Sequence, residues 1–185
     1  MSKAVVFLAD GFEECEGLLA VDLLRRAGCA VDTASISKQR QIISSHGVCL
    51  MADALADEVD FSDVDMIVLP GGMPGTSHLA GSSVVAAQCR AFAADPHKWV
   101  AAICAAPSVL GENGLLHGRK YTCYPGFEND EKYHGTYTAA PLQQDGKIVT
   151  ANGAGNAMTF ALYLLAALQG EEKALEVARS IQMKL

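Results

Sequence analysis

The sequence lacks any long hydrophobic run, which argues against a membrane-spanning helix. Its most apolar tract, Ala157–Leu168, is interrupted by Thr159 and Tyr163, and it is shorter than the roughly 20 residues that a helix needs to cross a bilayer. The first residues, Met1–Ala9, are too few for a secretory signal and lead directly into Asp10. We therefore expect an intracellular, cytoplasmic protein that does not associate with a membrane.

Positive charge is also scarce. The chain has 14 lysines and arginines against 21 aspartates and glutamates, which gives a net charge of −7. Lysines and arginines form no run longer than a pair, such as Arg25 and Arg26. Because the chain has no cluster of positive charge that would attract phosphate groups, we expect no specific binding of nucleic acid.

Closely spaced cysteine pairs and zinc-ligand motifs are missing as well. None of the six cysteines forms a C-x-x-C pair, and the five histidines are scattered without the spacing of metal ligands. We expect free thiols in a reducing compartment, no metal and no other cofactor. The cysteines stand at positions 15, 29, 49, 89, 104 and 123.

The composition that is present suits one α/β domain. A chain of 185 residues is long enough for one hydrophobic core and short for two, so we expect a single domain over residues 1–185. Half of the residues are apolar and 19% are charged, as in folds whose strands are covered on both sides. Strand and helix patterns alternate, which predicts a mostly parallel sheet with helices on both faces and ligands at the carboxyl ends of the strands.

The expected elements follow from apolar periodicity and from glycine and proline positions. Strands are expected at Lys3–Ala9, Cys29–Ile36, Met66–Leu69, Trp99–Ile103, Tyr121–Tyr124 and Lys147–Thr150. Helices are expected from about Glu13 to the residue before Gly28, and at Ser82–Ala94, Ser108–Asn113, Ala157–Leu168 and Glu171–Met183. An edge hairpin is expected at Gln41–Met51 and a polar aromatic loop at Glu128–Tyr137.

The most informative stretch is Trp99–Pro107, which reads W-V-A-A-I-C-A-A-P. If its apolar residues form a buried strand and Pro107 lies in the first turn of a helix, Cys104 occupies the sharp turn between them. Free amides and the dipole at a helix start favour a thiolate there, and the small Ala105 and Ala106 leave room for a substrate. The alternative is that Cys104 is a small apolar residue buried at a strand end.

A second candidate feature follows the strand Met66–Leu69, where the chain continues P-G-G-M-P-G. Without side chains, Gly71 and Gly72 can direct backbone N–H groups at a developing negative charge. The alternative is a plain tight turn after a strand.

The third candidate is Glu16, about one turn into the first helix. If the first strand and those before Gly71 and Cys104 are neighbours, their ends meet at one edge of the sheet. A carboxyl group beside a thiolate in a partly apolar cleft is driven towards its protonated form. The alternative is a simple partner of the helix dipole. His46 and His134 are expected at the surface.

These residues allow attack of sulfur on a small electrophilic carbonyl. Glycine amides would hold the oxyanion while Glu16 moves protons.

Four motifs in this order resemble the ThiJ/PfpI superfamily, and within it the parkinsonism-associated deglycase branch (DJ-one). They are A-D-G-F-E-E-C-E-G, V-L-P-G-G, A-A-I-C-A-A-P and A-N-G-A-G-N-A-M-T-F-A-L, and the resemblance covers nearly the whole chain. It implies a flavodoxin-like, doubly wound fold, a homodimer, a nucleophile-elbow cysteine at Cys104 and a protonated glutamate at Glu16. It also implies oxyanion amides from Gly72 and Ala105, with Arg26 approaching the site of the partner subunit.

The chain departs from related families at three places. Protease-like members have histidine directly after the cysteine, where Ala105 stands, and related amidotransferases need a late histidine, whereas none follows His134. In the T-C-Y-P run, Tyr124 occupies a place where many close relatives have histidine. Its hydroxyl can donate a proton but rarely acts as a base near neutral pH.

The resemblance implies a cofactor-independent deglycase or glyoxalase that protects against carbonyl and oxidative stress. Cys104 would add to methylglyoxal or its early adducts on amines and thiols, and Glu16 would shuttle the proton that leads to a hydroxy acid such as lactate. The alternative is a redox sensor or chaperone without turnover, in which Cys104 is oxidised to sulfinate. A third hypothesis is a hydrolase whose histidine reaches the sulfur only in the fold.

Overall fold

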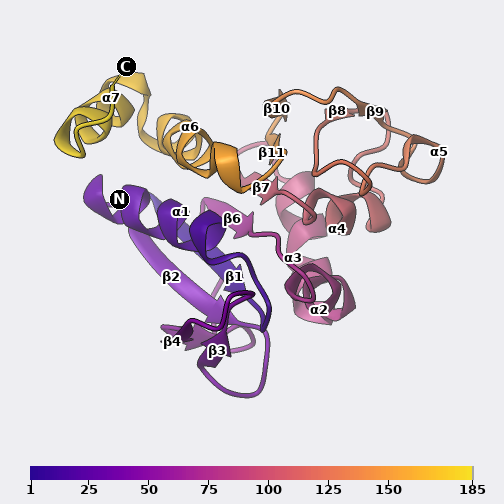
Figure 1. The fold of residues 1–185 in the computed structure, drawn as a ribbon, viewed down its shortest axis with the longest axis horizontal. Helices are drawn as coiled ribbons and strands as arrows, with labels where there is room; N and C mark the ends of the chain where they lie inside the picture. Colours follow the sequence, from indigo (N-terminus) through magenta and orange to yellow (C-terminus); the bar gives the residue numbers. More distant parts are fainter. Residues whose placement is uncertain (185) are drawn as a thin grey trace.

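A seven-stranded sheet forms the centre of the protein in the computed structural model, which describes residues 1–184 (Figure 1). The strand order is β10-β11-β7-β6-β1-β2-β5, and every neighbouring pair is parallel except β10 with β11. The strands are β1 (Lys3–Leu8), β2 (Ala30–Ser35), β5 (Ala54–Leu55), β6 (Met66–Leu69), β7 (Trp99–Ile103), β10 (Leu142–Asp145) and β11 (Ile148–Ala151). The order reverses between β1 and β6, the point at which doubly wound sheets bind ligands.

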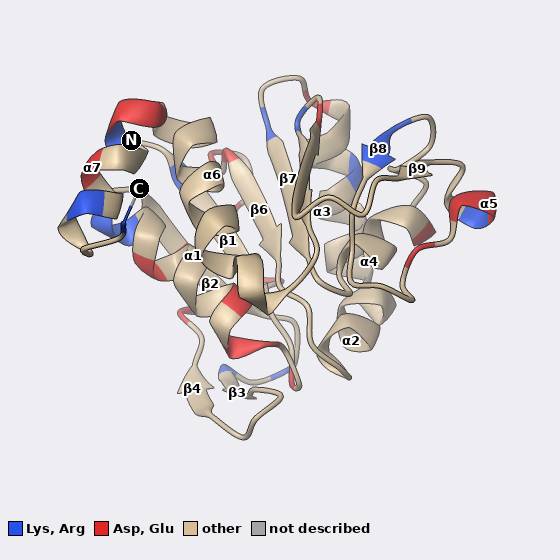
Figure 2. Cartoon of the chain, turned by 45° about the horizontal axis from the view of Figure 1, so that its top comes forward, with Lys and Arg blue, Asp and Glu red and all other residues tan. Residues whose placement is uncertain are grey.

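Helices cover both faces of this sheet (Figure 2). Alternate residues of β1 enter separate cores: Val6 and Leu8 pack under the first face, Val5 and Phe7 under the second. The first face carries α1 (Glu14–Arg26), α6 (Ala157–Gln169) and α7 (Glu171–Ser180), and the second carries α2 (Gly75–Gly81), α3 (Ser83–Ala94) and α4 (Pro107–Glu112). This confirms the expected α/β, doubly wound and mostly parallel architecture, in which strands buried on both faces are continuously apolar.

Smaller elements lie at the periphery. The hairpin of β3 (Gln41–Ile43) and β4 (Cys49–Met51) is confirmed, but it forms a two-stranded sheet of its own rather than an edge of the main sheet. A second small sheet pairs β8 (Lys120–Tyr121) with β9 (Thr136–Tyr137), and a 3₁₀ turn covers Ala154–Asn156. Figure 1 shows the β3–β4 hairpin protruding beyond the main sheet.

The prediction of a loop over Glu128–Tyr137 is wrong, because this stretch contains α5 (Asp130–Tyr133) and β9. The side chain of Asn129 caps α5 by accepting the N–H of Lys132, and Tyr133 is buried. Further elements are absent from the expectations, namely α2, the short edge strand β5, the polar strand β10 and the 3₁₀ turn. Glycine begins and ends α2, so local propensity does not indicate a helix there.

Most other boundaries agree with expectation to within a few residues, but the strand expected at Tyr121–Tyr124 is only the short β8, which lies outside the main sheet. In the described part of the chain, no helix combines the length and the apolar character needed to cross a bilayer. Figure 2 shows the positions of lysine and arginine along the backbone scattered over several elements in this view.

Candidate active site

The carboxyl ends of β1, β6 and β7 bring together the three features singled out from the sequence. A methyl group placed on Gly71 would lie 2.6 Å from Cβ of Cys104 and 2.8 Å from Oε2 of Glu16. The thiol and the carboxyl therefore flank Gly71 on the loop after β6, and only glycine fits between them.

Cys104 has an unusual backbone conformation that aims its side chain out of the sheet. Its φ is 63°, in the left-handed region that residues other than glycine rarely adopt. Two hydrogen bonds hold this turn: the N–H of Cys104 donates to the carbonyl of Ala151 at 2.9 Å, and its carbonyl accepts the N–H of Tyr124 at 2.7 Å. Pro107 then begins α4. Cys104 is partly exposed, so the expected turn between strand and helix presents a reachable sulfur.

Glu16 is fully buried, although it carries an ionisable group. Its Oε2 accepts the N–H of Gly71 at 2.8 Å, whereas Oε1 has no hydrogen-bond partner of normal geometry among the described residues. Burial raises the pKa of the Glu16 carboxyl to about 7, against the smaller opposing effects of the Gly71 amide and of a hydrogen bond with Cys104. This is the direction predicted from the sequence, and it makes Glu16 a proton donor or acceptor near neutrality.

The pKa of the Cys104 thiol moves in the direction opposite to the sequence-based expectation. Burial, followed by the neighbouring Glu16, raises it to about 12, while the amides of Gly72 and Ala105 act to lower it. The helix start alone therefore does not produce a free thiolate. Because the carboxyl is the first of the two acids to ionise, the pair loses one proton near pH 7. The proton that remains can pass from sulfur to Glu16 as the sulfur attacks.

The backbone amides divide into two roles. The N–H groups of Gly72 and Ala105 act on the sulfur of Cys104 and favour its ionised form, and their role as the oxyanion site stays a prediction. Gly72 has a φ of 87°, and a methyl group there would lie 2.4 Å from the backbone nitrogen of Glu13, so this position also requires glycine. The role predicted for Gly71 is corrected, because its N–H is occupied by Glu16 and positions that carboxyl instead.

Two other predicted residues take different positions. Tyr124 adjoins the site through its backbone hydrogen bond to Cys104, while its side chain is 52% exposed and its ring packs edge-on against Phe127. Arg26 lies in the last turn of α1, at the end of the helix away from Glu16, and forms an ion pair with Asp22 at 2.7 Å. Within one chain, the fold therefore does not bring Arg26 to Cys104.

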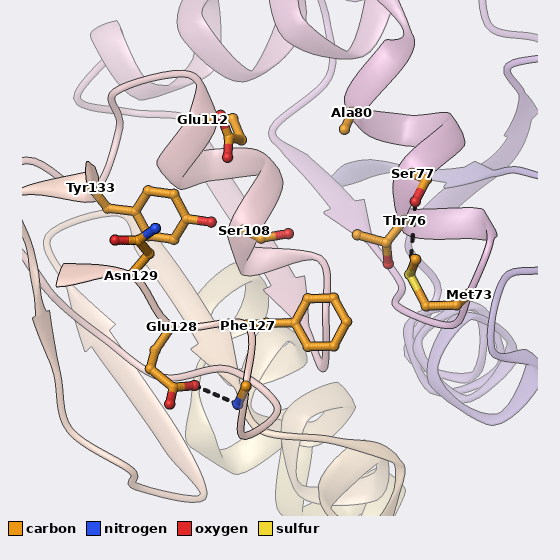
Figure 3. A pocket seen from close by; sticks show the side chains of 11 residues that line it. Met73, Thr76, Ser77, Ala80, Ser108, Glu112, Phe127, Glu128, Asn129 and Tyr133 are labelled. Carbon is orange, nitrogen blue, oxygen red and sulfur yellow. Dashed lines mark hydrogen bonds between the residues drawn. The ribbon is translucent and has the colours of Figure 1, made fainter. Parts of the chain in front are cut away.

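A groove beside the site was not anticipated, and we call it the α2–α4 groove. It has a volume of about 550 Å³ and runs between Met73 and Thr76 on one side and Ser108 and Glu112 on the other (Figure 3). Phe127 rises between the two walls. No single motif marks this groove, because its walls come from three separate segments and one of them is the unexpected helix α2.

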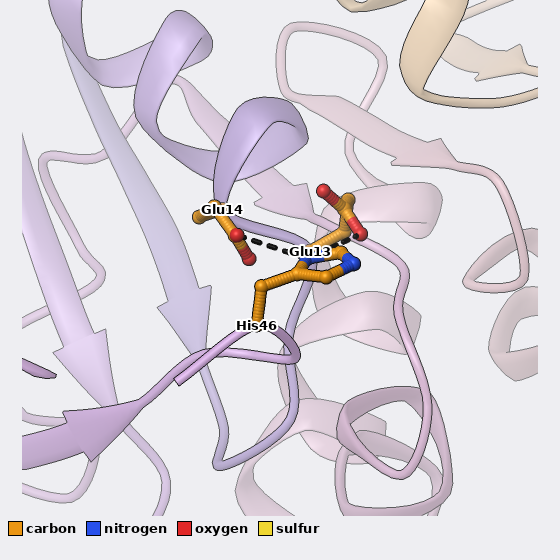
Figure 4. Close-up of side chains that lie close together, drawn as sticks. All are labelled: Glu13, Glu14 and His46. Carbon is orange, nitrogen blue, oxygen red and sulfur yellow. Dashed lines mark hydrogen bonds and ion pairs between the residues drawn. The ribbon is translucent and has the colours of Figure 1, made fainter. Parts of the chain in front are cut away.

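A cluster of Glu13, Glu14 and His46 also forms only in the fold (Figure 4). Nδ1 of His46 lies 2.9 Å from Oε1 of Glu14, and the hydroxyl of Ser45 lies 3.1 Å from Oε2 of Glu13. The three side chains offer ligand atoms within 4.8 Å of one another. Hydrogen bonds already pair these groups, so the geometry does not by itself indicate a bound cation, and the absence of a metal stays a prediction.

The histidines do not supply a partner for the sulfur. His46 contacts Glu14, and Nδ1 of His78 lies 2.9 Å from the carbonyl of Asp10. The rings of His117 and His134 pack against each other at 5.6 Å. As expected, His46 and His134 are exposed. These positions disfavour the Cys-His hydrolase hypothesis.

All six cysteines are free, in agreement with the expectation of unpaired thiols. Cys15, which precedes Glu16, is exposed, whereas Cys123 is buried. Among the six, Cys104 is thus the partly exposed thiol that faces both a buried acid and backbone donors.

Comparison with known proteins shows a match over nearly the whole chain. A family model described as the DJ-1/PfpI family matches residues 2–167. The protein dj-1beta of Drosophila melanogaster is 37% identical over 98% of this chain and 97% of its own length. Protein DJ-1 homolog B of Arabidopsis thaliana is also 37% identical over 98% of this chain, which spans only 42% of that longer protein.

A solved structure and a relative with a named activity extend this comparison. The oxidized DJ-1 of Toxoplasma gondii superposes with a TM-score of 0.93 at 35% identity, over 100% of both chains. A protein of Schizosaccharomyces pombe named glutathione-independent glyoxalase DJ-1 is 27% identical over 99% of this chain and 100% of its own length.

Proposed function

The chain belongs to the DJ-1/PfpI family, in its DJ-1 branch, and from this premise we propose that it is a cysteine-dependent glyoxalase and deglycase. Its substrates would be methylglyoxal or the early adducts of methylglyoxal, and it would protect the cytoplasm against carbonyl and oxidative stress. The observation that carries the proposal is the placement of Cys104 and Glu16 on either side of Gly71, with one carboxyl oxygen free. The glyoxalase name of the Schizosaccharomyces pombe relative supports the same activity.

The first step joins sulfur to the aldehyde carbon. Glu16 accepts the thiol proton as the S–C bond of a hemithioacetal forms, so no free thiolate has to accumulate. The N–H groups of Gly72 and Ala105 face the region where negative charge develops on the aldehyde oxygen. The oxygen then takes up a proton and becomes the hemithioacetal hydroxyl.

The second step moves a proton between neighbouring carbons. Glu16 removes the proton from the carbon bonded to sulfur, which gives an enediol, and returns a proton to the adjacent carbon. The product is a thioester of the hydroxy acid on Cys104. Water then breaks the S–C bond and releases lactate, which restores the thiol. A carboxyl group with a pKa near 7 suits both directions of this transfer.

We extend the proposal to a homodimer. Apolar side chains are exposed on the β3–β4 hairpin and on α1, and Met51 is 67% exposed. The hairpin packs against the start of α1 through the N–H of Ser45, which donates to the carbonyl of Phe12 at 2.8 Å. A second copy would cover this surface, and Arg26 would then approach the site of the partner subunit. The other exposed apolar residues of this surface are Leu18, Ile43 and Val48.

The test of the activity is lactate production from methylglyoxal by the purified protein. Cys104→Ser should abolish it, and Glu16→Gln should lower kcat by at least about 100-fold, because both proton transfers lose their acceptor. Cys15→Ser is the matched control, since this thiol is exposed and precedes Glu16 in the chain but is not among the groups nearest to Gly71. Lactate production that is undiminished in Cys104→Ser would refute the proposal.

The second candidate is a redox sensor or chaperone without turnover. The partly exposed sulfur faces the donors of Gly72 and Ala105, and these can hold sulfinate oxygens as well as an oxyanion. Mild peroxide followed by intact mass measurement separates the two functions. If turnover is negligible while Cys104 alone gains two oxygens and the fold persists, the sensor function is favoured.

A further inference from the structure

The α2–α4 groove is joined directly to the backbone groups of the active site. The N–H of Thr76 donates to the carbonyl of Gly72 at 2.9 Å, and the hydroxyl of Ser108 donates to the carbonyl of Ala105 at 2.7 Å. Each residue whose amide faces the sulfur is therefore held by a residue that lines the groove. The walls of the groove are thus hydrogen-bonded to the backbone that surrounds the sulfur of Cys104.

The groove has the chemical character of a site for a cation. Two carboxylates line it, and one of them, Glu112, is neutralised by an ion pair with Lys132. Glu128 forms no ion pair with another described residue, and its Oε2 accepts the N–H of Gly126 at 2.6 Å. The aromatic ring of Phe127 stands between the walls (Figure 3) and offers a face on which a guanidinium can stack.

A further polar group in the wall lacks a partner. Thr76 is 3% exposed, and its Oγ1 has no hydrogen-bond partner among the described residues. Buried hydroxyls are normally paired, so this one is available to a donor group of a ligand that settles into the groove. Figure 3 shows Thr76 on the α2 wall, across the groove from Ser108.

We propose that the α2–α4 groove binds the carrier of the aldehyde, that is, the amine part of an adduct, and that it prefers carriers with a guanidinium group. This inference rests on the proposed function for its catalytic consequence. The adduct is a hemiaminal, in which the aldehyde carbon is bonded to the carrier nitrogen. Its C–N bond breaks, the S–C bond to Cys104 forms, and the thiol proton passes through Glu16 to the departing nitrogen. Glu128 then faces a carrier that leaves as a cation.

Binding can be measured without turnover. Nα-acetyl-arginine amide and its neutral isostere Nα-acetyl-citrulline amide are titrated into the Cys104→Ser protein, and backbone NMR shifts are followed. The arginine derivative should bind about 3- to 5-fold more tightly, as expected for one solvent-accessible ion pair, with shifts centred on Thr76, Ser108 and Phe127. Glu128→Gln should abolish this preference. Glu131→Gln, a neighbouring exposed acid that does not line the groove, should retain it.

Steady-state kinetics provide a second, independent test of the carrier site. With methylglyoxal-modified Nα-acetyl-arginine amide as substrate, Glu128→Gln should raise KM about 3- to 5-fold, whereas Glu131→Gln should leave KM unchanged. Equal binding of the arginine and citrulline derivatives, or shifts that lie outside the groove, would overturn the inference. If the wild type lacks turnover but binds the arginine derivative selectively in the groove, the carrier site stands and only the proposed enzymatic function fails.

Discussion

At the scale of single residues, the function depends on two acids that share a small space. Glu16 is buried without a counter-charge and Cys104 is partly exposed. Burial raises the pKa of both groups; Glu16 raises the pKa of the thiol further, whereas the hydrogen bond with Cys104 acts to lower the pKa of Glu16. The amide of Gly71 fixes one oxygen of Glu16 and leaves the other free. Near neutral pH, Glu16 and Cys104 therefore hold one exchangeable proton between them, next to the nucleophilic sulfur.

The raised pKa of Glu16 has a consequence for stability. An acid whose pKa is higher in the folded than in the unfolded state stabilises the fold below its unfolded pKa of about 4.5, and this contribution is lost as pH rises through about 7. The free energy of unfolding should therefore fall between these pH values by on the order of 3 kcal/mol from this group alone.

Urea denaturation at several pH values checks this expectation. Glu16→Gln is the appropriate comparison, because glutamine keeps the acceptor for the Gly71 amide but does not titrate in this range. The difference in unfolding free energy between wild type and variant should shift in favour of the variant from pH 4.5 to pH 7. Parallel profiles for the two proteins would show that Glu16 titrates normally in the fold.

At the scale of elements, the site is built from three loops that follow parallel strands. The ends of β1, β6 and β7 coincide because the strands are neighbours in register, with Val6 opposite Val68 and Leu69 opposite Ala102. Gly71 lies close to both Cβ of Cys104 and Oε2 of Glu16. The loop after β6 therefore sets the distance between thiol and carboxyl.

Gly71→Ala should disable the site. The added methyl group would meet Cβ of Cys104 at 2.6 Å and the carbonyl oxygen of Ile103 at 2.9 Å, so the backbone has to move. We expect a loss of lactate production by at least about 100-fold, together with a destabilisation of about 1–3 kcal/mol. Steady-state kinetics and urea denaturation measure the two effects.

Gly81→Ala is the matched control, because a methyl group at this end of α2 meets nothing within 4 Å. It should retain both activity and stability. If Gly71→Ala behaves like this control, the close packing of thiol, glycine and carboxyl would be refuted.

The strands that position the site can be predicted from the sequence, whereas some elements at the border of the site cannot. The strands β6 and β7 were predicted at their observed bounds, because short apolar runs ended by Pro70 or Cys104 are distinctive. Helix α2 was missed because glycine begins and ends it and tertiary contacts, such as the buried Leu79, hold it in place. The hydrogen-bond partner of the Gly71 N–H and the pKa of the Cys104 thiol depend on burial in the fold, and local sequence patterns do not show burial of this kind.

At the scale of the whole molecule, the proposed dimer follows from an apolar surface that one chain leaves uncovered. The β3–β4 hairpin forms its own small sheet, and Ile43 and Met51 are 49% and 67% exposed on it. Exposed apolar side chains gathered on one protruding element are typical of interaction sites. The hairpin was predicted from the sequence, but its separation from the main sheet was not.

Met51→Glu should convert the dimer to a monomer. A charge placed in an apolar interface has no partner, and its desolvation should weaken association by at least about 100-fold. Light scattering coupled to size-exclusion chromatography gives the mass of each form. Leu175→Glu, an exposed apolar position on α7, is the control and should leave the mass unchanged. A wild type that is monomeric at all accessible concentrations would contradict the proposed dimer.

The most direct measurement of the central claim is the rate of Cys104 alkylation by iodoacetamide as a function of pH. We predict that the wild-type rate rises with a midpoint near pH 7, where the pair with Glu16 loses its first proton. In Glu16→Gln the midpoint should move to higher pH by at least about one unit, because burial still raises the thiol pKa and no carboxylate accepts its proton. Identical profiles in the two proteins, both with the midpoint of an ordinary thiol at about 8.5, would contradict the account.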